Sequence, residues 1–217
     1  MRTVAFVPIK FDSERCHLKN IRSFTNGEPL ISYILKTLLK IKEIDDIYVY
    51  CSSEQILGFL PNGVNWVQRD KKYDSQTASF NELIESFTKL IDADTYVLAH
   101  ATSPFISNNS IAAGIKAVNE DGYDSAFTVI EIREFLWSKD KPLNYCLENI
   151  PRTQDLDLIL METCGLYIFK KELITQMNRR IGFSPYIIPV SRVEGWDIDT
   201  EEDFWIADAL YNFMRSK

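Results

Sequence analysis

A loop rich in cationic and amide side chains directly follows the apolar run 3–7. The loop carries Lys10, Ser13, Arg15, Lys19 and Asn20. The apolar run predicts a β-strand, which would hold the loop at the edge of a sheet where its donors could converge on a polyphosphate. The same residues could instead form a surface loop whose basic side chains are only solvated.

Two carboxylates occupy alternate positions near the other end of the chain. Extended backbone at 196–199 would point the side chains of Asp197 and Asp199 the same way. Such a pair suits Mg²⁺, which usually takes one or two carboxylates and completes its shell with phosphate and water. The alternative is a helix start, because acidic residues are favourable in a first turn. That alternative leaves Asp197 unexplained, so the spacing favours a metal site.

Three segments, taken together, resemble the acylneuraminate cytidylyltransferases, the CMP-sialic acid synthetases. They are the opening strand and loop with the pair Lys19-Asn20, the Thr-Ser-Pro segment at 102–104, and Asp-Ile-Asp-Thr-Glu-Glu-Asp-Phe at 197–204. The match covers essentially the whole chain in order and spacing. It departs from the family in the loop, where Lys10 replaces an arginine and Phe11-Asp12 replaces two glycines.

The resemblance implies an enzyme that activates an acidic nonulosonic sugar with CTP. The anomeric hydroxyl of the sugar would attack the α-phosphorus, giving a CMP-sugar and pyrophosphate. Lys19 and Asp199 would be the catalytic residues, with Mg²⁺ held by Asp197 and Asp199. The altered loop leaves a second function open, that of a degenerate paralogue that binds nucleotide or sugar without turnover.

The resemblance also implies which residues bind the nucleotide and the sugar. The nucleotide-binding set is Lys10, Ser13, Arg15, Asn20, Arg69 and Ser79. Ser79 could instead be only a polar residue in the first turn of a helix. For the sugar, Arg152 and Gln154 lie in a segment similar to the family's Arg-Arg-Gln-Asp, so Arg152 could pair with a carboxylate.

His100 is the third candidate for sugar binding. It follows the strand-like run 96–99, and doubly wound sheets bind ligands at the ends of such strands. Many family members have glutamine at this position. A lone histidine is often structural, so both roles remain open.

Bulk composition excludes several classes of protein. The chain has 217 residues, 46% of them hydrophobic, and a net charge of −7, which argues against nucleic acid as a partner. Its cysteines, Cys16, Cys51, Cys146 and Cys164, form no Cys-x-x-Cys pair, so we expect no zinc site and a reducing compartment. No apolar run reaches the length of a membrane span or a secretion signal. We therefore expect a cytoplasmic protein that does not enter membranes.

Strand-like and helical patterns alternate along the chain. Strands are predicted at 4–9, 47–51, 96–99, 125–129 and 161–169, and helices at 30–40, 80–91, 111–118 and 200–211. This alternation predicts an α/β fold with a doubly wound, mostly parallel sheet. The resemblance places that fold in the nucleotide-diphospho-sugar transferase type.

Residues 131–164 interrupt this alternation with an irregular stretch. It is too long for a simple connection, so we expect an insertion that contributes to substrate binding, to dimerisation or to both. Phe135, Leu136, Trp137 and Tyr145 lie close together in it, which favours a homodimer contact. No linker or repeat divides the chain, so we expect residues 1–217 to form one domain.

Overall fold

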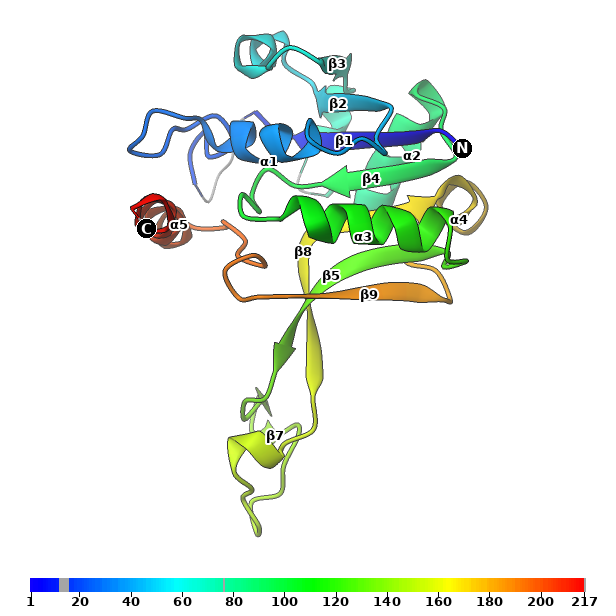
Figure 1. The fold of residues 1–217 in the computed structure, drawn as a ribbon. Coiled ribbons are helices and arrows are strands. Elements are labelled where there is room, and N and C mark those ends of the chain that lie inside the picture. Colours follow the sequence, from blue (N-terminus) through cyan, green and yellow to red (C-terminus); the bar gives the residue numbers. More distant parts are fainter. Residues whose placement is uncertain (12–15, 76, 217) are drawn as a thin grey trace.

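A seven-stranded sheet with the order β3-β2-β1-β4-β8-β5-β9 forms the centre of the molecule (Figure 1). The structure is a computed structural model that describes residues 1–11, 16–75 and 77–216. The strands are β1 (Thr3–Ile9), β2 (Asp46–Cys51), β3 (Val64–Gln68), β4 (Thr95–Ala99), β5 (Ser125–Ile132), β8 (Ile159–Lys170) and β9 (Pro185–Val190). All neighbouring pairs are parallel except those of β8, which runs antiparallel to β4 and β5.

Helices cover both faces of this sheet (Figure 1). On one face, α1 (Leu30–Leu38) and α3 (Asn108–Asn119) bury their apolar stripes against the strands. On the other, α2 (Phe80–Leu90) and α4 (Lys171–Met177) pack against an aromatic layer centred on Phe6, Phe87 and Tyr96. Short 3₁₀ turns lie at Glu54–Phe59, Lys71–Asp74 and Thr153–Asp155. The predicted mostly parallel α/β fold is confirmed.

Two elements, β9 and α4, were not predicted from the sequence, and each has a physical reason. The edge strand β9 contains Pro185 and Pro189, residues that argue against a central strand but are tolerated at an edge. Helix α4 spans only 7 residues, which is too short for a clear helical period.

None of the helices in the described part of the chain is both long and apolar enough to cross a bilayer.

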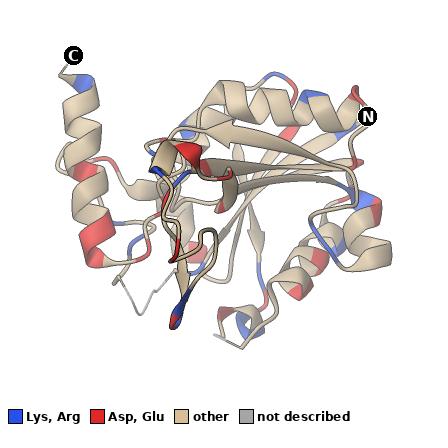
Figure 2. Cartoon of the chain, turned by 90° about the horizontal axis from the view of Figure 1, so that it is seen from below, with Lys and Arg blue, Asp and Glu red and all other residues tan. Residues whose placement is uncertain are grey.

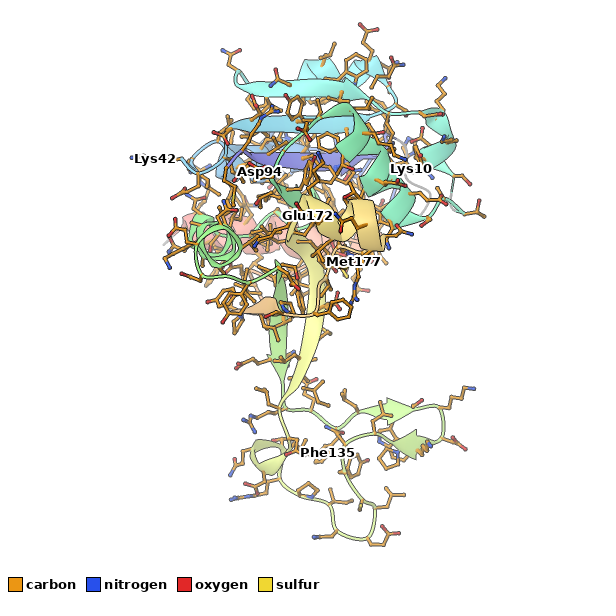
Figure 3. All side chains as sticks on the ribbon, turned by 90° about the vertical axis from the view of Figure 1, so that its right-hand side faces the viewer. Lys10, Lys42, Asp94, Phe135, Glu172 and Met177 are labelled. Carbon is orange, nitrogen blue, oxygen red and sulfur yellow. The ribbon has the colours of Figure 1, made fainter. Side chains whose placement is uncertain are left out.

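Strands β5 and β8 continue beyond the sheet and carry an arm, residues 133–158, away from the body (Figure 1). Figure 3 shows Phe135 in this arm, well separated from the sheet. The arm contains the short hairpin of β6 (Trp137–Ser138) and β7 (Lys141–Pro142). The irregular stretch is therefore shorter than the predicted 131–164, because Val129–Ile132 pair with Ile159–Glu162 as regular strand.

The last helix, α5 (Glu201–Arg215), lies beyond the carboxyl ends of β1 and β4 (Figure 1). It begins with the predicted capping box, in which the Thr200 hydroxyl accepts from Asp203 N at 3.2 Å and Asp203 Oδ2 accepts from Thr200 N at 2.8 Å. Phe204 and Ala207 bury the inner face of α5 against Phe24 and Leu30. The cap and this small core hold the segment before α5 in place.

Replacing Thr200 by alanine should lower the free energy of unfolding by about 1 kcal/mol, because the backbone N–H of Asp203 loses its acceptor. Ser79 is a matched control, since it precedes α2 in the same position but makes no side-chain capping bond. The variant Ser79→Ala should therefore change stability by no more than about 0.5 kcal/mol. Urea unfolding of both variants measures the difference, and equal losses would contradict the assigned cap.

Candidate active site

The predicted phosphate loop and the residues after β4 line one cavity of about 220 Å³. The cavity lies at the carboxyl ends of β1 and β4, where parallel strands of this fold leave room for a ligand. Its lining includes Lys10, Lys19, Asn20, Arg69 and His100. Ser13 and Arg15, also predicted to bind nucleotide, lie outside the described residues. Segments far apart in the sequence thus contribute cationic and amide groups to one place.

Lys19 joins the phosphate loop to the segment Asp-Ile-Asp-Thr-Glu-Glu-Asp-Phe at 197–204, which we call the closing motif. Its Nζ donates to the carbonyl oxygen of Ile198 at 2.6 Å and to Asp199 Oδ1 at 3.3 Å. The backbone of Ile198 is tied in turn to the segment after β4, because its N–H donates to the carbonyl oxygen of Thr102 at 2.9 Å. Lys19 is buried. A buried ammonium group needs such partners, so this contact fixes the position of the loop.

Asp197 and Asp199 have the chemistry of a site for a divalent cation. Burial raises the pKa of Asp197, the nearby charge of Asp199 raises it further, and a hydrogen bond from Thr102 opposes the rise. A cation between the two carboxylates would remove this electrostatic cost. The parts of the chain that the structure describes contain no group of three or more His, Cys, Asp or Glu that could hold a metal. One or two carboxylates are the usual protein contribution to a Mg²⁺ site, with phosphate and water as the remaining ligands, so Asp197 and Asp199 are the residues that would hold the ion.

The other acidic residues of the closing motif have structural partners. Glu201, Glu202 and Asp203 make the first turn of α5 acidic (red in Figure 2). Asp203 caps the helix, and Glu201 forms an ion pair of 2.6 Å with Arg22. The helix-start interpretation thus accounts for Glu201 and Asp203, and the metal site at Asp197 and Asp199 stays a prediction.

Arg69 and Asn20 are both committed to contacts within the chain. Arg69 is buried and pairs with Asp74, while its Nε is shielded and has no hydrogen-bond partner among the described residues. Asn20 Nδ2 donates to the carbonyl oxygen of Lys10 at 3.0 Å and so stabilises the loop. Ser79 is exposed before α2, with no cap bond to explain it.

His100 lies at the end of β4 with its ring centroid 5.5 Å from that of Phe80. Its Nε2 is shielded from solvent and has no partner among the described residues. Burial, together with the positive charges of Arg180 and Lys19, lowers the pKa of His100 to about 4. The imidazole is therefore neutral at physiological pH.

The structure places the two predicted sugar-binding residues of the insertion outside this cavity. Arg152 and Gln154 lie in the arm, where both side chains are exposed. Arg152 forms an ion pair with Asp155, with contacts of 2.7 and 3.0 Å. Within one chain these residues are not brought to the site, so their predicted role requires the arm of a second chain.

A second cavity, of about 370 Å³, is lined by Asp197 and Asp203 of the closing motif. Glu162, Cys164 and Arg192 also line it, and none of these three residues was predicted to belong to a site. A bulge of β8 presents Glu162 and Cys164, since the pairing with β5 jumps from Phe127–Tyr167 to Val129–Glu162. Cys164 has a φ of 58°, a conformation uncommon outside glycine and asparagine. Leu18, which precedes Lys19, has a similar φ of 51°.

The wild-type protein should lose stability steeply as the pH falls from 6.5 toward 4. In that interval the unfolded chain binds a proton at His100 that the folded chain excludes, so protonation favours unfolding. The variant His100→Gln lacks this proton site. Between pH 7 and pH 4 it should lose up to ~3 kcal/mol less stability than wild type. Urea unfolding at four pH values measures this, and parallel curves would show that the ring titrates normally.

Comparisons with known proteins agree with the fold described above. The family model described as cytidylyltransferase matches residues 4–181. The chain is 25% identical over 94% of its length to N-acylneuraminate cytidylyltransferase A of Danio rerio and 26% identical over 94% to N-acylneuraminate cytidylyltransferase of Oncorhynchus mykiss. It is also 26% identical over 56% of its length to 3-deoxy-manno-octulosonate cytidylyltransferase of Christiangramia forsetii. It spans about half of each relative, 49%, 49% and 47% of their lengths.

Solved structures share the fold. CMP:2-keto-3-deoxy-manno-octonic acid synthetase complexed with CTP superposes with a TM-score of 0.73 at 12% identity, covering 99% of this chain and 100% of that one. The 4-diphosphocytidyl-2C-methyl-D-erythritol synthase of Anaerococcus prevotii gives 0.68 at 13% identity, covering 97% and 96%. The match of the family model extends over most of the sheet and its helices. The chain therefore belongs to the cytidylyltransferase family.

Proposed function

We propose that this chain transfers CMP from CTP to an acidic sugar and releases pyrophosphate. The observation that carries the proposal is the contact of Lys19 with Ile198 and Asp199, which brings a buried cation and a pair of carboxylates to the ends of β1 and β4. A polyphosphate needs both cations and a metal to neutralise its charge, and this junction offers them side by side. The family membership and the shared fold support CTP as the nucleotide.

In the proposed reaction the anomeric hydroxyl oxygen of the sugar forms a bond to the α-phosphorus. The bridge between the α- and β-phosphates breaks, and its electron pair leaves with pyrophosphate. Lys19 would hold the phosphates in position, and Lys10 would contribute a point charge. Mg²⁺ bound by Asp197 and Asp199 would supply Lewis-acid stabilisation of the developing charge.

The sugar is proposed to be a nonulosonic acid. The names of the relatives state that they act on N-acylneuraminate or on 3-deoxy-manno-octulosonate, and both compounds are keto sugar acids. The larger cavity is lined by Asp197, and the smaller one is lined by Lys19 and Lys10. We infer that the sugar occupies the larger cavity and the nucleotide the smaller one.

Changing Asp199 to asparagine should lower kcat for pyrophosphate release by at least about 100-fold at saturating Mg²⁺, since a metal clamp supplies several kcal/mol. The matched control is Asp121→Asn, because Asp121 pairs with Lys116 at an exposed position far from the site. Assays would contain CTP with N-acetylneuraminate or 3-deoxy-manno-octulosonate, and EDTA should abolish the signal. Turnover near the wild-type value in folded Asp199→Asn would remove this residue from the site.

The same assay decides the second candidate function. The loop departs from the family at Lys10 and Phe11, while Asp12 lies outside the described residues. A degenerate paralogue would bind CTP without releasing pyrophosphate from any acid in the panel. The combination of Lys19 with Asp197 and Asp199 favours turnover, because a module that only binds nucleotide has little need of a metal-activated polyphosphate.

We also propose that the chain forms a homodimer through the arm. Large apolar side chains are exposed along it: Phe135, Trp137, Leu143, Leu147, Ile150 and Leu158. An apolar surface of this extent is typical of a protein interface. A two-fold dimer would give each arm a surface to bury and would let it approach the site of the partner.

Light scattering at micromolar concentrations should give about twice the 25.1 kDa mass of this chain. Changing Leu143, Leu147 and Ile150 together to serine should give the monomer, because the contact loses its buried apolar area. The control is Leu57→Ser, at a position 46% exposed on the body of the protein. A monomeric wild type would contradict the proposal.

A further inference from the structure

Arg180 adjoins residues of both cavities of the candidate site. It follows α4, and its guanidinium carbon lies 4.4 Å from the ring centroid of Tyr167 and 5.4 Å from that of Phe80. Phe80 and its neighbour His100 line the smaller cavity. Tyr167 donates its hydroxyl proton to Glu162 Oε2 at 2.8 Å, and Glu162 lines the larger cavity. Arg180 itself lines neither cavity, but it contacts Phe80 of the smaller one and is linked to Glu162 of the larger one through Tyr167.

Arg180 uses only part of its hydrogen-bonding capacity within the chain. Burial raises the pKa of Tyr167, and a hydrogen bond from Arg180 and its positive charge oppose that rise. A guanidinium group has five N–H donors. Within the described chain, Arg180 Nη1 donates to Asn81 Oδ1 at the long distance of 3.4 Å, and Nε is shielded from solvent with no partner. No carboxylate of the described residues lies within ion-pair distance of it. A partly buried cation in this condition has the capacity to take an anionic ligand.

The adjacent Arg179, in the same turn, has hydrogen-bond and ring contacts within the chain that Arg180 can be compared with. Its Nε donates to the carbonyl oxygen of Ile181 at 2.6 Å, and its guanidinium carbon lies 4.4 Å from the ring centroid of Phe183. Its contacts stabilise the loop and account for its presence. Arg180 lacks equivalent backbone acceptors, so loop structure alone does not explain it.

The surroundings of Arg180 suit a carboxylate ligand. The rings of Phe80 and Tyr167 exclude water from the faces of the guanidinium group, which strengthens an ion pair at its edge. The planar fork of arginine matches a carboxylate in two parallel hydrogen bonds. The carboxylate of Glu162 is already oriented, because it accepts a hydrogen bond from the Tyr167 hydroxyl. His100 beside Phe80 is neutral and does not compete for the anion.

We propose that Arg180, beside Phe80 and Tyr167, binds the carboxylate of the acidic sugar within the same chain. The inference rests on the proposed function and makes it more specific, because it names the residue that selects an acid over a neutral sugar. The competing assignment is Arg152, which is exposed in the arm and paired with Asp155.

The inference is tested by changing Arg180 and the ligand carboxylate separately and together, as in a double-mutant cycle. KM and kcat would be measured with N-acetylneuraminate, with 3-deoxy-manno-octulosonate and with the methyl ester of each acid. Arg180→Met should raise KM for the preferred acid about 10- to 100-fold, the loss expected for a charged hydrogen-bonded pair. KM for CTP should stay within about twofold. Arg180→Lys should recover part of the loss, because it keeps the charge without the fork.

The esters and the control variant separate recognition from structure. With the ester, Arg180→Met should have KM within about threefold of wild type, because the charge that Arg180 binds is gone. Arg179→Met should leave KM for the acid unchanged. An equal rise in KM for acid and ester, or an unchanged KM for the acid in folded Arg180→Met, would overturn the inference. A rise confined to Arg152→Met would assign the carboxylate to the arm.

Binding measurements keep this outcome distinct from failure of the proposed function. If wild type releases no pyrophosphate with either acid, the transferase proposal fails. Calorimetric titration of the same two acids into wild type, Arg180→Met and Arg179→Met then tests Arg180 directly. Binding weakened at least about tenfold in Arg180→Met alone would support the inference. Equal binding to all three, or no binding to wild type, would overturn it.

Discussion

The position of one ammonium group, Lys19 Nζ, determines how the parts of the site relate to one another. Removing a lysine from water is costly unless its charge and protons are matched. Here the partners are the carbonyl oxygen of Ile198 and Asp199, and Ile198 is bonded to the segment after β4. The phosphate loop, the closing motif and the end of β4 are therefore connected through a short set of contacts. Loss of that ammonium group would remove a positive charge that opposes the rise in the pKa of Asp197, which burial and the charge of Asp199 cause.

Packing around α5 supports this arrangement from outside. Arg22 pairs with Glu201 at 2.6 Å and lies over the ring of Phe204 at 4.3 Å, while Thr25 Oγ1 donates to Asp208 Oδ1 at 2.9 Å. The helix is thus attached to the segment that follows the phosphate loop. A run of acidic residues can serve both helix and site because each member has a different partner. This division explains how a helix-start signature and a metal-site signature coexist in one motif.

The helices and strands that were predicted from the sequence are those whose buried residues recur at a regular spacing. Helices α1, α2 and α3 and the interior parallel strands fall in this class. The reversed direction of β8 could not be predicted, since a strand buried on both faces has the same apolar pattern in either direction. Resemblance to a family identified Lys19, Asp197 and Asp199, which occur in local motifs. Arg180 and Glu162 belong to no motif, and only the folded chain shows what surrounds them.

The distance along the chain between the two halves of the Lys19 contact has a consequence for biosynthesis. Lys19 and Ile198 are 179 positions apart, so the segment that receives the Lys19 ammonium group is synthesised long after the loop that carries it. During translation the sheet around β1 and β4 can form while Lys19 still has only water as its partner. The carboxylates reach the junction only when residues 197–199 emerge. A nascent chain therefore passes through a long stage in which its cationic loop lacks the carbonyl and carboxylate partners that fix its position.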